Sequence, residues 1–434
     1  MKNLPESIKL KLDTSIQNVV DVSRLYVKNP EKDFTRKRSL PLTTVIEILL
    51  AMGGNNLNKE LLSFFNYNSD VVSSSAFVQQ RSKLLSEALG FLLFDFVDSI
   101  NNLKTYNGYR FLAVDGTGTC IPKNPLHPGT YVKSQDNNQI HITALYDLCN
   151  KIYTDAEIQV IKEKNEYKAL TNMIDRSNIT GPVIITGDRG FASYNNIAHL
   201  EAKGWKYLIR AKCPKSKKSS FSTLNLPLNQ EFDCEIKFKL TRSITKKMQK
   251  NKEKYRLLVN SSTFDYLEKG SKETYPICYR AVCVEVDHGK FQYFITNLDS
   301  EEFPKEKIKD LYKKRWGVET SFRELKYALG LTSFHSKKVD LIKQEIYAKM
   351  VMYNFCELIT LNVIITQKPR KHTYQVNFTM AIHICKQYFL KFKDADPPDV
   401  EALIQKYILP IREDRIYPRK VKTRSRISFL YRVA

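Results

Sequence analysis

The chain has 434 residues, which is enough for two to four domains. Hydrophobic residues make up 42% of it and aromatic residues 11%, so it can fill a sizeable core and is not an intrinsically disordered protein. Lysine and arginine number 69 against 46 aspartates and glutamates, a formal net charge of +23. This excess points to a polyanionic partner, with nucleic acid first and an anionic membrane surface second.

The sequence predicts neither a secretory signal nor a membrane span. The opening stretch MKNLPESIKLKLDTSIQ carries charged residues where a signal peptide has its apolar core. The most apolar stretch, 350–365, is shorter than the roughly 20 apolar residues that cross a bilayer, and it contains Asn354 and Glu357. We therefore expect a buried helix there, no association with membranes, and a cytoplasmic protein that is associated with the nucleoid.

Eight cysteines are scattered along the chain. Only Cys278 and Cys283 are close, and four intervening residues without a second such pair are a weak zinc signal. We expect reduced thiols, most of them packed in the interior.

Residues 1–105 are predicted to form a helical region. The stretch TTVIEILLAMGG ends in two glycines, which stop a helix, and a serine-rich start precedes apolar residues at helical spacing in 73–100. Such a region either binds DNA or packs on the core, and its sequence leaves both open.

From about residue 109 the apolar pattern changes to that of buried strands. RFLAVDGTG is a short apolar run that ends in Asp115 and two glycines. IHITALYDLCN and KIYTDAEIQVI are two further strands, which we expect to pair through a turn at Asn150 and Lys151.

Helices and strands then alternate. A helix is expected at 163–178, a buried strand ends in Asp188, a second helix is closed by Gly204, and a strand follows at 205–212. Strands that first pair and then alternate with helices are typical of a mixed sheet covered by helices. The sequence thus predicts an α/β core whose first part is 106–213.

The pattern breaks between 214 and 290. The stretch 213–220 is a polar, basic linker, and short β-rich runs then lie among clusters of charge. This composition predicts an antiparallel β insertion. The core is expected to resume at 291–345, with the strand FQYFITNL and a helix after it.

The remainder, 346–434, is predicted to be a helical region with a basic tail. The tail, 415–433, interleaves aromatic residues with lysine and arginine. It is either a phosphate-binding segment or a solvated end, and its sequence does not distinguish the two.

The segment 312–329 predicts one helix with a buried stripe and a polar flank. At 100° per residue, four polar side chains fall within a strip about 60° wide. They are Tyr312, Arg315, Glu319 and Lys326. A carboxylate on such a flank is fixed by packing yet still reaches a ligand. The alternative is a set of ordinary ion pairs four residues apart, each worth about 0.2–0.5 kcal/mol.

Two aspartates follow apolar strands. Asp115 ends FLAVD, Asp188 ends VIITGD, and glycines follow both, which lets a ligand approach the backbone. Ligands gather at strand ends in sheets covered by helices, although each aspartate is alternatively a turn or cap residue. With Glu319 they supply three hard carboxylates that suit Mg²⁺ or Mn²⁺. Two such ions can activate a water and stabilise the leaving oxygen in phosphoryl transfer.

The polar flank resembles the signature of a known family. DDE transposases of the insertion-sequence-4 type carry, on their last catalytic helix, Tyr, two residues, Arg, three residues, Glu, six residues and Lys. Every gap is matched here by Tyr312, Arg315, Glu319 and Lys326.

Both aspartates lie in motifs similar to those of the same family. The second acidic motif, Asp followed by Gly and an aromatic residue, matches DRGF from Asp188, and the first matches Asp115 in AVDGTG. The similarity covers roughly 105–345, including the ITNL strand and a β-rich insertion. It implies a ribonuclease-H-like mixed sheet with flanking helices, interrupted by an antiparallel β insertion, with helical N- and C-terminal regions.

The resemblance also implies what the site residues do. Asp115, Asp188 and Glu319 would be the catalytic triad, holding two Mg²⁺ ions that Mn²⁺ can replace. A second set would contact DNA phosphates beside the reacting bond. This set is Tyr312, Arg315 and Lys326.

Some relatives stack a flipped base on a Trp of the insertion, but Trp205 and Trp316 lie outside 214–290. An insertion aromatic is the alternative, since any aromatic face can stack on a base. The candidates are Phe264, Tyr266 and Tyr275.

The function implied is that of a transposase acting on double-stranded DNA. It would bind the terminal inverted repeats of its element as a homodimer, cleave DNA and transfer a strand into target DNA. The alternatives are a metal-dependent nuclease without strand transfer and a non-catalytic DNA-binding protein derived from a transposase.

Overall fold

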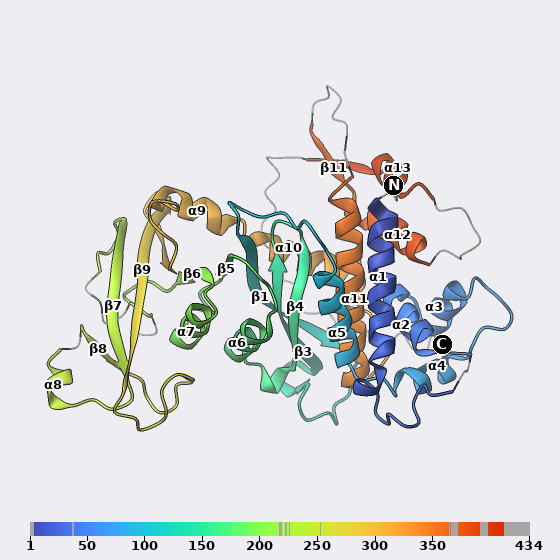
Figure 1. Ribbon diagram of the computed structural model, residues 1–434, viewed down its shortest axis with the longest axis horizontal. Coiled ribbons are helices and arrows are strands. Elements are labelled where there is room, and N and C mark those ends of the chain that lie inside the picture. Colours follow the sequence, from blue (N-terminus) through green and yellow to red (C-terminus); the bar gives the residue numbers. More distant parts are fainter. Residues whose placement is uncertain are drawn as a thin grey trace.

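The computed structural model shows one long sheet with helices on both faces and a helical bundle at one end (Figure 1). It describes residues 4–36, 39–216, 219–221, 224, 226–251, 253–363, 365, 372–390 and 398–411. The basic tail at 415–433 lies outside the described residues.

Ten strands form the main sheet in the described part of the chain. They are β1 (Arg110–Ile121), β2 (Tyr131–Val132), β3 (Asn137–Asp147), β4 (Ile152–Val160), β5 (Val183–Gly187), β6 (Lys206–Ala211), β7 (Phe232–Thr241), β8 (Tyr255–Leu257), β9 (Thr274–Asp287) and β10 (Lys290–Thr296). Their order is β2-β3-β1-β5-β6-β10-β9-β7-β8, and β4 pairs with β3. A separate pair joins β11 (Tyr374–Val376) to β12 (Ile408–Pro410).

The sheet is mixed, as its sequence predicts. Strand β3 runs antiparallel to β1 and β4, whereas β1, β5 and β6 are parallel neighbours. The predicted pairing of the second and third strands is confirmed, and Lys151 in their turn has a φ of +53°. The first strand is longer than predicted, because β1 continues beyond Asp115 to Ile121.

The strands predicted as an insertion extend the main sheet. Strand β9 pairs antiparallel with both β10 and β7, so β7–β9 form the far end of the same sheet (Figure 1). The division of the chain into domains at 214 and 290 stays a prediction.

Thirteen α-helices lie in the described residues. They are α1 (Leu4–Asp21), α2 (Leu42–Ala51), α3 (Leu57–Phe64), α4 (Ser74–Arg81), α5 (Glu87–Asp98), α6 (Glu166–Arg176), α7 (Tyr194–Ala202), α8 (Lys246–Gln249), α9 (Lys305–Lys313), α10 (Trp316–Tyr327), α11 (Val339–Thr360), α12 (Phe378–Phe389) and α13 (Val400–Lys406). Polar side chains start several of them: Ser73 accepts a bond from the Ala76 amide, and Asn165 from Lys168. Helix α2 ends just before the glycine pair that was expected to stop it.

Alternating side chains along the strands separate two layers of helices. Leu112 and Val114 of β1 pack with α6 and α7 on one face. Phe111 packs with α9 and Ala113 with α10 on the other. Any polar residue at an odd position of β1 therefore faces α9 and α10.

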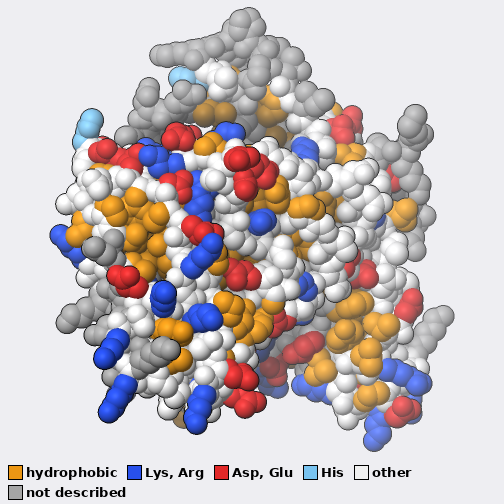
Figure 2. All heavy atoms as spheres, turned by 60° about the vertical axis from the view of Figure 1, so that its left-hand side comes forward, with side chains coloured by type: hydrophobic (Ala, Val, Ile, Leu, Met, Phe, Trp, Pro, Cys, Tyr) orange, Lys and Arg blue, Asp and Glu red, His pale blue; other side chains and the backbone are white. Residues whose placement is uncertain are grey.

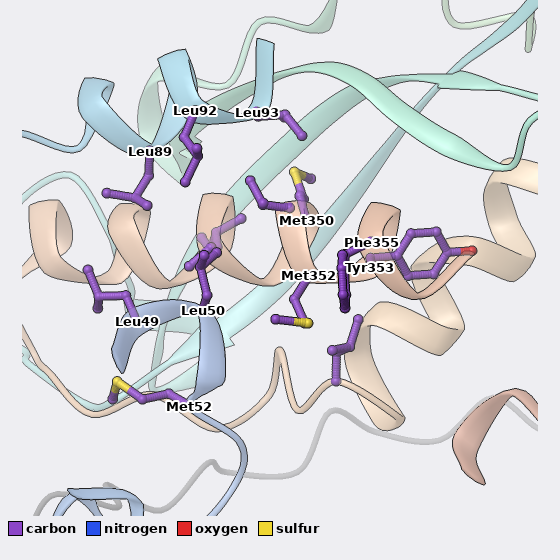
Figure 3. Packing of buried hydrophobic residues seen from close by; sticks show 14 of the residues in the cluster. Leu49, Leu50, Met52, Leu89, Leu92, Leu93, Met350, Met352, Tyr353 and Phe355 are labelled. Atoms are coloured by element: carbon purple, nitrogen blue, oxygen red, sulfur yellow. The ribbon is translucent and has the colours of Figure 1, made fainter. Parts of the chain in front are cut away.

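Helix α11 is the centre of the helical bundle. Figure 3 shows its side chains packed between those of α5 and α2. The expectation of a buried helix is confirmed over Met350–Thr360, where every residue is buried. No helix among the described residues is both long and apolar enough to span a bilayer. None of the eight cysteines, all of which lie in described residues, forms a disulfide, and four of them rather than most are buried.

The predicted single helix at 312–329 is wrong in one respect. Helix α9 ends at Lys313 and α10 begins at Trp316. The amides of Lys314 and Arg315 bond to carbonyls three residues back, so the junction is wound more tightly than an α-helix. Gly317 follows this turn, and a Cβ there would lie 2.9 Å from Leu148 Cδ2.

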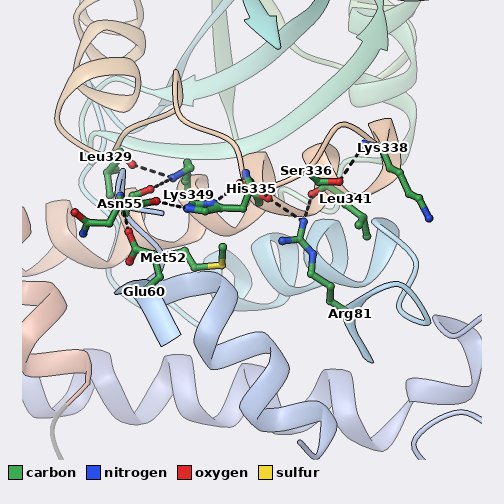
Figure 4. Close-up of polar contacts among 12 residues, drawn as sticks. Met52, Asn55, Glu60, Arg81, Leu329, His335, Ser336, Lys338, Leu341 and Lys349 are labelled. Carbon is green, nitrogen blue, oxygen red and sulfur yellow. Dashed lines mark hydrogen bonds and ion pairs between the residues drawn. The ribbon is translucent and has the colours of Figure 1, made fainter. Parts of the chain in front are cut away.

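A buried charge network joins the N-terminal helices to α11 (Figure 4). Arg81 donates to Glu345 Oε1 at 2.9 Å, and both side chains are fully buried. His335 Nδ1 lies 3.1 Å from Glu345 Oε2. Burial by itself would raise the pKa of Glu345, but the charges of Arg81 and His335 lower it to about 2.

Glu345→Gln should lower the free energy of unfolding by about 3–5 kcal/mol, because it leaves the buried Arg81 without an anion. Chemical denaturation at pH 7 measures this. Asp310→Asn removes an exposed ion pair with Lys313 and is the control, with no measurable change expected.

The same variant has a predicted pH dependence. The folded pKa of Glu345, about 2, is below the roughly 4.3 of an unfolded glutamate. Its contribution is therefore complete above about pH 5 and is lost as the pH falls toward 2. The stability gap to wild type should close over that range, and a constant gap would contradict the assignment.

Candidate active site

The parallel pairing of β1 with β5 brings the two predicted aspartates together. The last paired positions are Val114 and Gly187, so Asp115 and Asp188 are the next residues on adjacent strands. Adjacent strands lie about 4.8 Å apart. Both aspartates are one residue beyond positions that face α6 and α7, so both face α10.

The sequence predicted that Asp115 ends its strand. This prediction is wrong, because β1 continues to Ile121. Asp115 stands where β1 loses its β5 neighbour and continues paired only with β3. The opening in the sheet therefore comes from the end of β5 rather than of β1. Asp188 does follow its strand directly, and its Oδ1 accepts the Gly190 amide at 2.7 Å.

The helical residues of the signature converge on the same place from α9 and α10. Arg315 Nη2 donates to Glu319 Oε1 at 2.6 Å, and its Nη1 lies 3.7 Å from Asp115 Oδ2. Lys326 Nζ donates to Thr117 Oγ1 at 2.5 Å and to the Gly118 carbonyl at 3.0 Å. Arg315 thus lies between two carboxylates, and Lys326 spans from α10 to β1.

The packing of α10 explains why these groups are fixed. Val318, Phe322 and Leu325 are buried against the sheet, each worth about 1.5–3 kcal/mol. Glu319 lies on the flank of that stripe and stays partly exposed. Tyr312, at the end of α9, packs edge-on to Phe294 with ring centres 4.9 Å apart.

All six predicted site residues line one pocket of about 690 Å³. Its walls combine three carboxylates with five cationic side chains. The lining residues are Asp115, Gly116, Thr117, Asp188, Arg189, Arg210, Tyr312, Arg315, Trp316, Glu319, Phe322, Arg323, Lys326 and Tyr327.

Asp115 is held in this pocket at an electrostatic cost. Burial raises the pKa of Asp115 to about 6, more than the Gly116 amide and Arg315 lower it, and the charges of Glu319 and Asp188 add to the rise. A cation in the pocket offsets this cost. In the present arrangement that cation is Arg315.

The pocket fits a divalent ion in its chemistry but not yet in its geometry. Three carboxylates are the oxygen ligands that Mg²⁺ prefers. Among the described residues, however, no three His, Cys, Asp or Glu side chains already converge to hold a metal ion. Glu319 is engaged by Arg315, so it would have to leave this ion pair to join Asp115 and Asp188 on an ion.

Several residues of the pocket were not predicted from the sequence as site residues. Arg189 follows Asp188 directly, and Arg323 lies seven residues after Trp316 on the exposed face of α10, so both could have been found by spacing. Arg210 lies on β6, and only the strand order brings it here. Trp316 and Tyr327 are large aromatic side chains that remain 57% and 77% exposed beside the acids.

The candidate stacking residues of the insertion lie elsewhere. Phe264, Tyr266 and Tyr275 pack on one another, with ring centres 5.1–5.9 Å apart. Tyr266 also contacts His199 of α7. They belong to the face of the sheet that α6 and α7 cover, opposite the pocket.

Positive charge is not gathered into one field over the visible surface. Figure 2 shows lysine and arginine interspersed with acidic side chains on the face that includes the β7–β9 end. The lining of the pocket combines five cations with three carboxylates, an excess of two positive charges.

Comparison with known proteins assigns the chain to a family. The family described as "Transposase DDE domain" matches residues 106–355, more than half of the chain. The chain belongs to the DDE transposase family. The match includes Asp115, Asp188 and Glu319, and it confirms the resemblance drawn from the sequence.

One curated relative of this DDE transposase belongs to an insertion sequence 4 element. Over 148 residues it is 28% identical to the "Transposase InsG for insertion sequence element IS4" of Escherichia coli strain K12. That alignment spans 31% of this chain and 33% of the relative, so it covers about a third of each protein. A solved piggyBac transposase synaptic complex with hairpin DNA is similar with a TM-score of 0.44 and 12% identity, over 83% of this chain and 73% of that chain.

Gly187→Ala should lower the free energy of unfolding of this DDE transposase by about 1–3 kcal/mol, because the added methyl group overpacks the core. A Cβ at this position would lie 2.9 Å from Val114 Cγ1 and 3.3 Å from Phe191 Cβ. Urea denaturation measures the change. Gly54→Ala, whose Cβ meets Ser333 Oγ at an ordinary 3.5 Å, is the control, and an equal effect of both changes would refute the packing argument.

Proposed function

We propose that the chain is the transposase of a mobile element, which binds the terminal inverted repeats of that element, cleaves DNA there and transfers the freed strand into target DNA. The observation that carries the proposal is that Asp115, Asp188 and Glu319 line one pocket together with five cationic side chains. Acidic and basic side chains in one open pocket suit a phosphodiester substrate, since lysine and arginine bind phosphate and carboxylates bind metal ions.

The core is proposed to be ribonuclease-H-like. The order β4-β3-β1-β5-β6 supports this, with β3 antiparallel to its neighbours and β1, β5 and β6 parallel. In this arrangement the first acid lies on the central strand, the second follows its parallel neighbour, and the third comes from a helix packed on the same face.

Asp115, Asp188 and Glu319 are proposed to hold two Mg²⁺ ions, which Mn²⁺ can replace. Bound ions would activate the attacking water or hydroxyl and stabilise the leaving oxygen. The chain's own part is to orient the three carboxylates. The buried stripe of α10 fixes the position of Glu319, and the β1–β5 pairing fixes those of Asp115 and Asp188.

Arg315 is proposed to exchange partners when DNA and metal bind. Its guanidinium lies between Asp115 and Glu319, and it can turn to a phosphate once a metal ion neutralises the acids. Tyr312 would donate a hydrogen bond without adding charge, and Lys326 would neutralise a phosphate next to β1. Double-stranded DNA, both element ends and target, is the proposed partner, bound by a homodimer.

One assay tests the whole proposal. The protein is incubated with DNA that carries its candidate ends and with a target plasmid, with and without Mg²⁺. Excised and joined products only with Mg²⁺ are expected. Cut products that never join would favour a nuclease, and binding without cutting would favour a non-catalytic DNA-binding protein.

Glu319→Gln should leave affinity for end DNA within about threefold and reduce cleavage in Mg²⁺ by at least about 10³-fold, since one metal ligand is lost. Gel shift and cleavage assays measure the two effects. Glu306→Gln, on the exposed first turn of α9, is the matched control and should cut normally. Normal cutting by the Glu319 variant would refute the triad.

Lys326→Met should weaken binding of end DNA and lower the slope of log affinity against log salt by about 1, because one phosphate contact is lost. Titrations at several salt concentrations measure the slope. Lys343→Met, on α11 away from the pocket, is the control. An unchanged slope in the Lys326 variant would remove this residue from the DNA contacts.

A further inference from the structure

A buried lysine on α11 is unexplained by the proposed chemistry. Lys349 is 2% exposed, and burial lowers its pKa to about 8 with the help of Lys386, although Glu345 and Glu60 oppose the shift. Its Nζ donates to the Leu329 carbonyl at 3.1 Å and to the Gly53 carbonyl at 3.3 Å (Figure 4). An ammonium taken out of water at this cost is expected to have a specific task.

The two carbonyls that Lys349 binds occupy equivalent positions. Gly53 is the second residue after α2, and Leu329 is the second residue after α10. The C-terminal end of a helix carries partial negative charge and unsatisfied carbonyls, which a cation satisfies. Lys349 therefore connects the ends of two helices that are far apart in sequence.

The two helix ends meet closely enough for one side chain to join them. Gly330 has a φ of +72°, and a Cβ there would lie 3.5 Å from the Gly53 carbonyl oxygen. Glycine is the residue that adopts this left-handed conformation without strain. From α12, Lys386 donates to the neighbouring Met52 carbonyl at 3.2 Å, which adds a second cation at the end of α2.

The loop that follows α10 is held by the same face of α11. Glu345, one turn before Lys349, accepts the His335 amide and the guanidinium of Arg81. His335 Nε2 lies 2.8 Å from the Asn55 carbonyl. The whole connection from α10 to α11 is thus fixed against the N-terminal helices.

This joint lies at the end of the helix that carries the pocket. Leu329 is three residues after Lys326, whose Nζ spans to β1. Lys349 itself does not line the pocket. A change at Leu329 would alter how far α10 reaches along β1, and with it the positions of Lys326 and Glu319.

We propose that Lys349 is a positioning residue, which ties the C-terminal end of α10 to the N-terminal helices and thereby sets the placement of Lys326 and Glu319 in the pocket. The part that concerns DNA cleavage rests on the proposed function. The part that concerns α10 does not, since it is a statement about the free protein.

Lys349→Met keeps the length of the side chain and removes the ammonium, so it tests both parts. Hydrogen–deuterium exchange of the full chain reads the last turn of α10 through the amides of Ala328, Leu329 and Leu331, which bond within that turn. We expect these amides to exchange at least about tenfold faster, with the centre of α11 unchanged. Lys343→Met, on the same helix but half-buried, is the matched control. It should change amide exchange neither in the last turn of α10 nor at the centre of α11.

The second readout separates positioning from general stability. At saturating end DNA and Mg²⁺, the single-turnover cleavage rate of Lys349→Met should fall about tenfold or more. Its affinity for end DNA should fall no further than that of Lys326→Met, and its unfolding midpoint should stay near wild type. Wild-type exchange at α10 would overturn the proposal, and so would a wild-type cleavage rate. If the wild-type protein cuts no DNA, the proposed function fails, and the exchange measurement alone decides the role of Lys349.

Discussion

The parallel pairing of β1 with β5 is the constraint on which the site depends. It places Asp115 and Asp188 on adjacent strands and, through side-chain alternation, on the same face of the sheet. Burial raises the pKa of Asp115 to about 6, and the charges of Glu319 and Asp188 add to this rise. The arrangement is stable only with positive charge nearby, which explains why cations crowd the same pocket.

Helices α9 and α10 and their junction supply three of these five cations and the third acid. Because the junction at Lys314 and Arg315 is tightly wound, the Tyr312 ring of α9 packs against Phe294 while the Arg315 side chain points toward the acids. In the free protein Arg315 supplies positive charge between Asp115 and Glu319. Under the proposed function, exchange of these contacts for metal and phosphate would couple the assembly of the site to the arrival of its substrate.

The N-terminal helices and α11 contact the segment that follows α10. Arg81, Glu345 and Lys349 are buried charges, and replacing such groups by apolar ones often raises stability. Their contacts instead fix where the segment after α10 lies relative to the N-terminal helices. These buried contacts thus define the geometry at the end of α10, as fully satisfied polar networks do in other proteins.

The sequence by itself determined most strands of the main sheet, the β3–β4 hairpin, the buried stripe of α10 and the spacing of the signature, because all are periodic or local patterns. It also singled out three acids that line one pocket, since each follows or flanks an apolar run. Only the tertiary structure decided that Arg210 joins them, that β7–β9 extend the main sheet, and that Lys349 links two helix ends. These features depend on strand order and helix packing. Both bring together residues that are far apart in the sequence, and neither produces a periodic pattern in it.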